Sequence, residues 1–474
     1  MGAITFGTEG WRAVTAEGFT VENVCTVAQA VAEHFRDTAS HIHKKPTVAV
    51  GYDTRFLSDH FARRVCEVLT ANGLHSVLAD RPIPTCAVSR YVVSQRLVGG
   101  IVITASHNPP LYNGFKVKEA FGGSATPATV ASIERRLGRR PAKRLLFEQA
   151  SQRGLVQQAN MLPAFLNGIR TCVDLATIRK SRLKVVVDVM HGAADGLMER
   201  LVSGGRCTIH TLHAQPDPLF GGHAPEPIPS HLGELTQVVG RHRWDVGLAT
   251  DGDADRIGAI APNGAFITPG QILCILLDHL LTTRTWRGAV VKTISNTSMI
   301  DRMTRELGLR LEEVPVGFKH IAKLMLEDEV LIGGEESGGI GIRGYLPERD
   351  GILIGLLLLE AMAAQGLGIL ELLRRLERRF GQWFYDRRDL TVSPERVTRF
   401  FHRLTSRPPS RVAGIPVTDV KTLDGVKLIG NDDSWLLFRR SGTEPIVRVY
   451  AESPSARRVK RLLAFGVQLI RNFA

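Results

Sequence analysis

An alternation of short apolar strands with helical patterns constrains the fold of this chain more than any other feature. Valine-rich runs begin near Pro46, Arg182 and Arg287, and a helical pattern over residues 58–72 follows the first of them. Near-continuous apolar strands are typical of sheets that helices cover on both faces. Because the same rhythm begins three times, the sequence predicts three similar α/β domains.

The pattern changes after Arg379. Short alternating strands, such as residues 434–439 and 446–450, precede a last helical pattern over residues 455–472. A chain of 474 residues is also too long for a single hydrophobic core. The sequence therefore predicts the α/β class, with three similar mixed-sheet α/β domains and a C-terminal α+β domain around a central cleft. The predicted domains are residues 1–152, 153–262, 263–378 and 379–474.

Composition and cysteine usage indicate a cytoplasmic protein that does not enter a membrane. Hydrophobic residues make up 44% of the chain and charged residues 23%, as in ordinary globular proteins. No leader pattern opens the sequence, and the longest apolar stretch, residues 352–364, contains Gly355 and Glu360 and is shorter than a bilayer span. The six cysteines form no CxxC pair, so we expect reduced, mostly buried thiols without a disulfide framework or a structural zinc site.

The net charge of +13 has two interpretations. A nucleic-acid-binding protein gathers basic residues on one face, and the arginines of this chain are densest between Arg374 and Arg411. Aromatic residues make up only 6%, however, and no nucleic-acid-binding motif is present. We therefore expect a solvated basic surface and no nucleic-acid partner. A positive field also attracts small anionic substrates.

A serine loop follows the apolar run at residues 98–103. Ser106 comes directly after this strand, at the end where α/β sheets commonly present functional groups. A serine hydroxyl needs a base or a cation to become a good nucleophile, and Lys116 is ten residues away. The chain has no Gly-x-Ser-x-Gly elbow, and a serine in a proline-containing loop is more often structural than catalytic, so this loop taken alone favours a structural serine.

A second loop carries three aspartates at alternate positions, Asp251, Asp253 and Asp255. Clustered carboxylates repel one another without a cation, and oxygen ligands suit a hard ion such as Mg²⁺. A calcium-binding EF-hand loop is disfavoured because Arg256 and Pro262 stand where that loop needs Gly and Glu. The simpler alternative is a solvated acidic turn.

Two further loops carry groups that suit a phosphorylated sugar. Glycine-flanked Glu335 and Ser337 can hydrogen-bond adjacent hydroxyls, although a tight turn explains the same residues. Residues 439–445 combine guanidinium groups, hydroxyls and a glycine N–H, which is suitable chemistry for binding a phosphate. An exposed turn is the competing interpretation of this last segment.

Together the loops resemble those of the α-D-phosphohexomutase superfamily, which includes phosphoglucomutases and phosphomannomutases. Residues 104–109 look like its phosphoserine loop, 251–256 like its magnesium loop, 334–338 like its sugar-recognition loop and 439–445 like its substrate-phosphate loop. Residues 6–12 also resemble the N-terminal signature of the family. The resemblance covers essentially the whole chain, with the motifs in the family order.

The resemblance implies phosphoryl transfer in two steps. Ser106 would rest as a phosphoserine and pass its phosphoryl group to a free hydroxyl of a sugar monophosphate. The resulting bisphosphate, glucose 1,6-bisphosphate for a glucose substrate, would turn over in the site and return its other phosphoryl group to Ser106. Asp251, Asp253, Asp255 and an oxygen on Ser106 would bind Mg²⁺.

Further residue roles follow from the same resemblance. Lys116 and Arg12 would flank the reacting phosphate, where either could assist proton transfer. The expected substrate-binding residues are Arg256, Gly317, Lys319, Glu335, Ser337, Arg439, Ser441, Gly442 and Thr443.

Two details indicate the sugar. Residues 316–319 resemble the Gly-aromatic-Lys element of phosphoglucomutases, and Gly339 stands where many bacterial phosphomannomutases have histidine. We therefore expect a phosphoglucomutase that interconverts glucose 1-phosphate and glucose 6-phosphate, acting as a monomer or homodimer on hexose phosphates. A phosphomannomutase or a dual-specificity enzyme is the alternative within the family, and a metal-dependent phosphatase is an alternative outside it.

Overall fold

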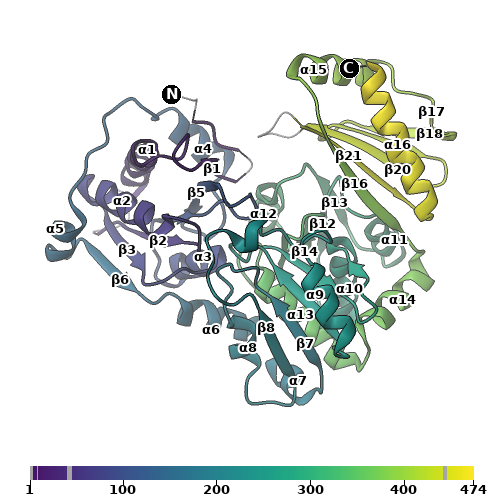
Figure 1. Cartoon of the computed structure of the whole chain (residues 1–474), viewed down its shortest axis with the longest axis horizontal. Helices are drawn as coiled ribbons and strands as arrows, with labels where there is room; N and C mark the ends of the chain where they lie inside the picture. The colour runs from purple at the N-terminus through teal and green to yellow at the C-terminus, as the bar shows by residue number, and fades with distance from the viewer. Residues whose placement is uncertain (1–3, 8, 40–44, 441–445, 474) are drawn as a thin grey trace.

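The computed structural model describes residues 4–7, 9–39, 45–440 and 446–473. Four sheets follow one another along the chain, and we call the parts built on them the first, second and third α/β units and the C-terminal unit (Figure 1). The predicted class, three mixed-sheet α/β parts followed by a different C-terminal part, is confirmed.

The first sheet is mixed, with the strand order β1-β5-β4-β2-β3-β6. Strands β2, β3, β4 and β6 run parallel, whereas β5 pairs antiparallel with both β4 and β1. Its strands are β1 (Trp11–Val14), β2 (Thr47–Tyr52), β3 (His75–Ala79), β4 (Gly99–Ile103), β5 (Tyr112–Glu119) and β6 (Val156–Ala159).

The second and third sheets repeat the central order of the first. The orders β3-β2-β4-β5, β8-β7-β9-β10 and β13-β12-β14-β15 each place three parallel strands beside one antiparallel strand. The additional strands are β7 (Lys184–Asp188), β8 (Thr208–Leu212), β9 (Val246–Thr250), β10 (Ile257–Ile260), β11 (Phe266–Ile267), β12 (Ala289–Thr293), β13 (Leu311–Val314), β14 (Val330–Gly334) and β15 (Ile340–Ile342).

This repetition makes three loops topologically equivalent. The β4–β5 loop carries Ser106, the β9–β10 loop carries the three aspartates, and the β14–β15 loop carries Glu335 and Ser337. Each follows the carboxyl end of the third parallel strand, which is the edge where α/β sheets place their functional groups.

Helices cover both faces of these sheets, as the apolar runs predict. In β4, Ile101 and Ile103 pack in a core with α1 and α2, whereas Val102 points into a second core that contains α3. That second core continues through α6, the second sheet, α10, α13 and α14, so the three α/β units share apolar packing. The helices are α1 (Val21–Ala39), α2 (Ser58–Ala71), α3 (Thr85–Ser94), α4 (Pro127–Glu134), α5 (Phe147–Gln152), α6 (Leu162–Cys172), α7 (Leu175–Lys180), α8 (Leu197–Val202), α9 (Gly233–Arg241), α10 (Pro269–Thr282), α11 (Ser298–Glu306), α12 (Phe318–Glu327), α13 (Gly351–Gln365) and α14 (Ile369–Phe380), with the short 3₁₀ helix η1 (Phe220–Gly222).

Helix α13 is the most apolar helix of this core. The Asp350 side chain caps it by accepting from the N–H groups of Ile352 and Leu353, and Gly366 ends it in the left-handed region at φ 62°. Among the described residues no single helix has the length and apolarity to cross a membrane; α13 and α14 meet these criteria only as a pair bent by 82°. The buried residues of both helices belong to the shared core.

The C-terminal unit is an antiparallel sheet with the order β16-β21-β20-β19-β18-β17. Its helices α15 (Pro394–Ser406) and α16 (Ala456–Phe473) pack in one core with the sheet. The Trp435 indole donates to the Ser298 hydroxyl at 3.0 Å and to the Glu452 carboxylate at 2.9 Å, which joins this unit to α11. The strands are β16 (Phe384–Thr391), β17 (Arg411–Val412), β18 (Ile415–Lys421), β19 (Val426–Gly430), β20 (Trp435–Arg440) and β21 (Ile446–Ser453).

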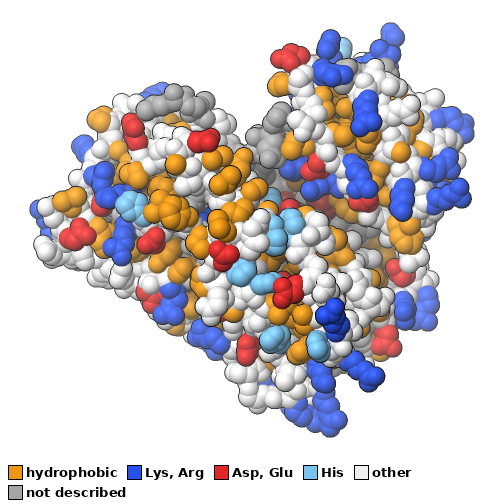
Figure 2. Space-filling model, in the orientation of Figure 1, with side chains coloured by type: hydrophobic (Ala, Val, Ile, Leu, Met, Phe, Trp, Pro, Cys, Tyr) orange, Lys and Arg blue, Asp and Glu red, His pale blue; other side chains and the backbone are white. Residues whose placement is uncertain are grey.

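Figure 2 shows Lys and Arg side chains spread over the C-terminal unit, and the surface is hollowed between this unit and the first α/β unit. Arg457, Lys460 and Arg461 of α16 are among the exposed basic residues, in agreement with a solvated basic surface. The six cysteines are free and buried, as expected. Two strands lie just past a predicted domain boundary: β6 follows residue 152 but belongs to the first sheet, and β11 follows residue 262 but belongs to the second sheet. The domain boundaries stay predictions.

Candidate active site

The backbone of the serine loop is held by a buried arginine. Ser106 adopts a left-handed conformation with φ 54°, which turns the chain sharply after β4. Arg55, whose side chain is fully buried and paired with Asp53 at 3.1 Å, lies against this turn. Its guanidinium donates to four loop carbonyls, those of Ser106 (2.7 Å), Asn108 (2.7 Å), Pro109 (2.9 Å) and Tyr112 (2.9 Å).

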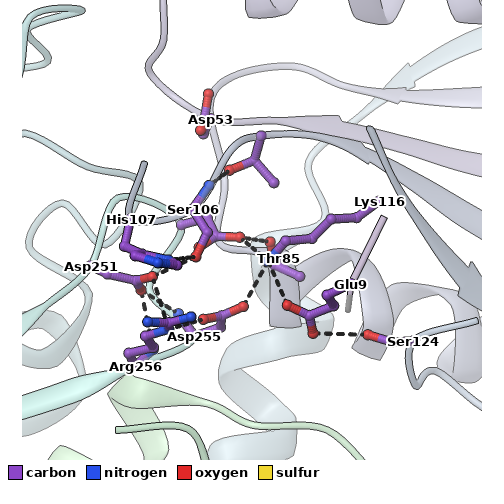
Figure 3. A network of polar contacts seen from close by, with 12 residues as sticks. Glu9, Asp53, Thr85, Ser106, His107, Lys116, Ser124, Asp251, Asp255 and Arg256 are labelled. Carbon is purple, nitrogen blue, oxygen red and sulfur yellow. Dashed lines mark hydrogen bonds and ion pairs between the residues drawn. The ribbon is translucent and has the colours of Figure 1, made fainter. Parts of the chain in front are cut away.

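The Ser106 hydroxyl points at the aspartate loop. Ser106 Oγ donates to Asp251 Oδ2 at 2.8 Å, across two separate sheets of the molecule (Figure 3). His107 Nδ1 lies 3.5 Å from the same hydroxyl. Burial, followed by the charge of Arg256, lowers the pKa of His107 well below its ordinary value, so the ring is neutral at pH 7.

The three aspartates form one buried cluster. Asp251, Asp253 and Asp255 are each fully buried, and one ligand oxygen from each lies within 4.8 Å of the others. Asp251 Oδ1 accepts from the N–H groups of Asp255 and Arg256, which fixes the loop, but Asp253 Oδ1 and Asp255 Oδ1 have no hydrogen-bond partner. Buried carboxylate oxygens without donors are costly unless a cation binds them. The oxygen-only donor set therefore fits Mg²⁺.

The three carboxyl groups have different pKa values, because burial and the neighbouring charges act on them unequally. Burial and then the Asp253 charge raise the pKa of Asp251 to about 7, and the same two effects raise the pKa of Asp255 well above its ordinary value. The pKa of Asp253 moves down, because Lys116 outweighs the effect of burial. The cluster thus carries negative charge that a divalent ion would stabilise.

Cations surround the cluster. Lys116 Nζ donates to Asp253 at 2.6 Å and to Asp255 at 2.8 Å; burial opposes its charge, but the two aspartates raise its pKa above the ordinary value. The guanidinium of Arg12 donates to the Asn108 side chain of the serine loop. Arg256 Nε lies 3.9 Å from carboxylate oxygens of both Asp251 and Asp255.

The sugar-recognition loop lies against this cluster. Glu335 is buried, and burial raises the pKa of its carboxyl to about 7, whereas Ser337 is half-buried. Gly317, with φ 129°, begins α12 and leads to Lys319. A cavity of about 180 Å³ is lined by Glu9, Lys116 and Lys319 together with residues of α4, so the first and third units contribute to one pocket.

Of the predicted substrate-phosphate loop, residues 439–445, the structure describes only Arg439 and Arg440. Arg439 is mostly buried, and its Nε donates to Asp424 Oδ2 at 2.6 Å, while the same oxygen accepts from the Val316 N–H at 2.9 Å. This contact brings the beginning of the phosphate loop beside the Gly317–Lys319 element. The predicted residues Ser441, Gly442 and Thr443 lie outside the described residues.

Several residues of the site were not among those predicted from the sequence to act in it. Arg349 donates to Glu335 and Asp255, Glu9 is paired with Lys116, and Thr85 donates to Asp253. Each is far in sequence from its partner, so no local spacing announces the contact. Arg349 stands in a run of three charged residues, Glu348 to Asp350, directly before an apolar helix, and this was the available hint.

The family comparison covers all four parts of the chain. The family Phosphoglucomutase/phosphomannomutase matches as its alpha/beta/alpha domain I at residues 3–143, domain II at 163–264, domain III at 268–380 and C-terminal domain at 408–467. These four segments occur in the order of the four sheets.

Individual relatives match over nearly their full length. The Phosphoglucomutase/phosphomannomutase of Thermococcus kodakarensis is 29% identical, with 98% of each chain covered. A probable phosphoglucosamine mutase of Methanothermobacter thermautotrophicus is 30% identical, with 96% of this chain and 95% of the relative covered. A solved structure from Thermus thermophilus that carries a provisional phosphomannomutase name is 35% identical, with a TM-score of 0.86 and coverage of 99% of this chain and 100% of the relative.

Fold and comparison together define an enzyme class, the phosphohexomutases. The chain belongs to the phosphoglucomutase/phosphomannomutase family, the α-D-phosphohexomutase superfamily. The names of these three relatives refer to different sugars, so membership of the family does not by itself determine which hexose this chain prefers.

Proposed function

We propose that this phosphohexomutase is a phosphoglucomutase, which interconverts glucose 1-phosphate and glucose 6-phosphate through a phosphoserine at Ser106 and a glucose 1,6-bisphosphate intermediate. One observation carries the chemistry: the Ser106 hydroxyl lies 2.8 Å from Asp251 in a buried carboxylate cluster that retains unpartnered oxygens. Such a serine can hold a phosphoryl group beside a hard cation.

The residues of the chain divide the work of the transfer. Asp251, Asp253 and Asp255, with an oxygen on Ser106, would hold Mg²⁺, which when bound neutralises charge on the transferred phosphoryl group. Lys116 stays protonated beside the aspartates and donates hydrogen bonds toward the reacting phosphate. Arg12, which reaches the serine loop through Asn108, is a second cation at this place and an alternative participant in proton transfer.

The substrate is held by the remaining loops. Glu335 and Ser337 accept and donate hydrogen bonds to neighbouring ring hydroxyls, while Arg439 with Ser441, Gly442 and Thr443 binds the phosphate that does not react. Arg256, Gly317 and Lys319 complete the substrate contacts. A sugar bisphosphate that turns end for end presents similar groups to the same loops, which explains how one site serves both transfers.

Support for glucose comes from the third unit. Gly317, Phe318 and Lys319 have the phosphoglucomutase-like order, and Gly339 stands in place of a histidine. A side chain is also excluded at Gly339, since a Cβ there would lie 2.6 Å from Arg349 Cδ and 2.9 Å from Glu335 Oε2. A phosphomannomutase or dual-specificity enzyme is the second candidate, because the names of two relatives include that activity.

A coupled assay with glucose 1-phosphate and mannose 1-phosphate tests the sugar. We expect kcat/KM for glucose 1-phosphate to be the larger by at least about tenfold, which corresponds to the contacts of one ring hydroxyl. Equal values would contradict the glucose preference. Intact-mass measurement after incubation with glucose 1,6-bisphosphate should show one stable phosphate on Ser106, and its rapid loss to water would favour a phosphatase.

A further inference from the structure

Arg349 occupies a fixed place between the third sheet and α13. Its two neighbours set its backbone: Asp350 caps α13, and Glu348 pairs with Lys118 of β5, an ion pair whose two side chains are fully buried. Arg349 itself is 3% exposed. Because the chain is anchored on both sides, the guanidinium is presented in one direction.

That direction is toward carboxylates from three different units. Nη1 donates to Glu335 Oε2 of the sugar-recognition loop at 2.9 Å, and Nη2 donates to Asp255 Oδ2 of the aspartate loop at 2.9 Å. Nη2 also donates to Glu9 Oε2 of the first unit. A planar fork of N–H donors can serve several carboxylates at once, which a lysine ammonium does with less geometric definition.

The third unit is built to let this side chain approach. Gly339 has no Cβ, and one placed there would lie 2.6 Å from Arg349 Cδ. The Phe318 ring centroid lies 6.0 Å from Arg349 Cζ, at the start of the helix that carries Lys319. Arg349 thus lies close to both third-unit elements that are proposed to contact the sugar.

We propose that Arg349 is a positioning residue that sets the distance between the sugar-binding carboxylate Glu335 and the aspartate loop beneath Ser106. This inference rests on the proposed phosphohexomutase reaction, in which a hydroxyl of the bound sugar must reach the phosphoryl group on Ser106. One rigid cation that touches both loops fixes that separation. Near-attack geometry is sensitive to shifts of about 1 Å, so loosening this contact should affect the transfer itself as well as binding.

A double-mutant cycle with Arg349→Gln and Glu335→Gln tests the coupling, with kcat and KM measured for the hexose phosphate that the wild-type enzyme uses best. We expect Arg349→Gln to raise KM about tenfold and to lower kcat about tenfold, as for the loss of a buried charge-assisted hydrogen bond. If Arg349 acts through Glu335, the double variant should be little worse than Glu335→Gln alone. Calorimetry with glucose 6-phosphate on the Ser106→Ala protein should show the matching increase in Kd without turnover.

Arg349→Lys provides a second variant with the charge retained, for use if Arg349→Gln does not fold. It should stay defective in kcat, since one ammonium cannot reproduce the fork. Arg284→Gln is the matched control, because Arg284 also joins separate elements through buried partners, Glu360 of α13 and the Cys172 carbonyl of α6, but contacts neither Glu335 nor Asp255. It should lower the melting temperature while leaving KM and kcat within about twofold of wild type.

Three results would overturn the inference. Effects of Arg349 and Glu335 that add independently would show that they do not act together, and full rescue by Arg349→Lys would reduce the role to charge alone. An Arg284→Gln enzyme with the same kinetic defect would show that Arg349 only tethers elements of the fold. An active wild type with any of these results refutes this inference alone, whereas a wild type that neither turns over nor binds any hexose phosphate refutes the proposed function as well.

Discussion

At the scale of single residues, the site depends on a hydroxyl beside a buried cluster of ionisable groups. Within the cluster, five carboxyl groups (Asp251, Asp253, Asp255, Glu9 and Glu335) lie among four cations (Arg12, Lys116, Arg256 and Arg349). A divalent cation and a phosphate dianion carry opposite charges of equal size, so their joint entry would leave the net charge of the cluster nearly unchanged. Ser106 is the group at which these two additions would meet.

Ser106→Ala should abolish phosphoryl transfer, with kcat reduced by at least about a thousandfold, since no other hydroxyl would carry the phosphoryl group. Its stability should change by less than about 1 kcal/mol, because the hydroxyl makes one hydrogen bond at 2.8 Å and one weaker contact at 3.5 Å. The coupled assay and a thermal melt measure the two effects. Ser94→Ala, at an exposed position of α3, is the control and should match wild type. Appreciable residual transfer in Ser106→Ala would place the phosphoryl group elsewhere.

Arg55→Met should damage the serine loop although Arg55 is not expected to touch the substrate. The change removes four hydrogen bonds to loop carbonyls and leaves the Asp53 carboxylate buried without its cation. We expect a loss of about 3–5 kcal/mol in the free energy of unfolding, measured by urea denaturation. The folded fraction should also show lower kcat. Arg81→Met removes an exposed pair with Asp80 and should cost less than about 1 kcal/mol; a similarly small loss for Arg55→Met would contradict its supporting role.

At the scale of secondary structure, three topologically equivalent loops, β4–β5, β9–β10 and β14–β15, carry different functional side chains. Each follows the third parallel strand of its sheet, yet one carries Ser106, one the aspartate cluster and one Glu335. The strand pattern could be predicted because apolar runs and their spacing are local properties. The family resemblance implied that the loops meet in one site, but the contacts between them could not be predicted, since these depend on how the units pack through their shared core.

Asp253→Asn should weaken metal binding by the aspartate loop. The change removes a charge from a cluster whose Asp253 Oδ1 and Asp255 Oδ1 have no protein donor. Titration calorimetry with Mn²⁺ or Mg²⁺ should show Kd raised by about tenfold or more. Asp195→Asn, at an exposed position of the same unit, controls for the general loss of one negative charge. An unchanged Kd for Asp253→Asn would argue against a cation site in this loop.

At the scale of the whole molecule, the C-terminal unit joins the rest through polar contacts with the third unit. Glu452 Oε2 accepts from the Ser298 N–H, at the start of α11, at 2.7 Å and from the Trp435 indole of β20 at 2.9 Å. Asp424 makes a second junction between Arg439 and Val316. The position of Arg439 relative to the Gly317–Lys319 element therefore depends on this junction.

Glu452→Ala should loosen the junction, because it removes the acceptor of the Ser298 N–H and one of the two acceptors of the Trp435 indole in a buried interface. We expect the free energy of unfolding to fall by about 1–3 kcal/mol and KM to rise more than kcat falls, since the phosphate loop binds and does not react. Urea denaturation and the coupled assay measure these quantities. Asp433→Asn breaks the exposed Arg302 pair at the same interface and should change neither. A Glu452→Ala effect confined to kcat would contradict this account.

By itself, the sequence determined the layered α/β architecture, the change of pattern in the C-terminal part and the family, because strand periodicity and short motifs are written in neighbouring residues. It also supplied Ser106, Lys116, the three aspartates and Glu335, which the structure brings together. Only the tertiary structure showed that Arg55 binds the carbonyls of the serine loop and that Arg349 contacts three carboxylates. The reason is physical: a buried charge is stable only beside partners that satisfy it, and here those partners come from segments far apart in the chain.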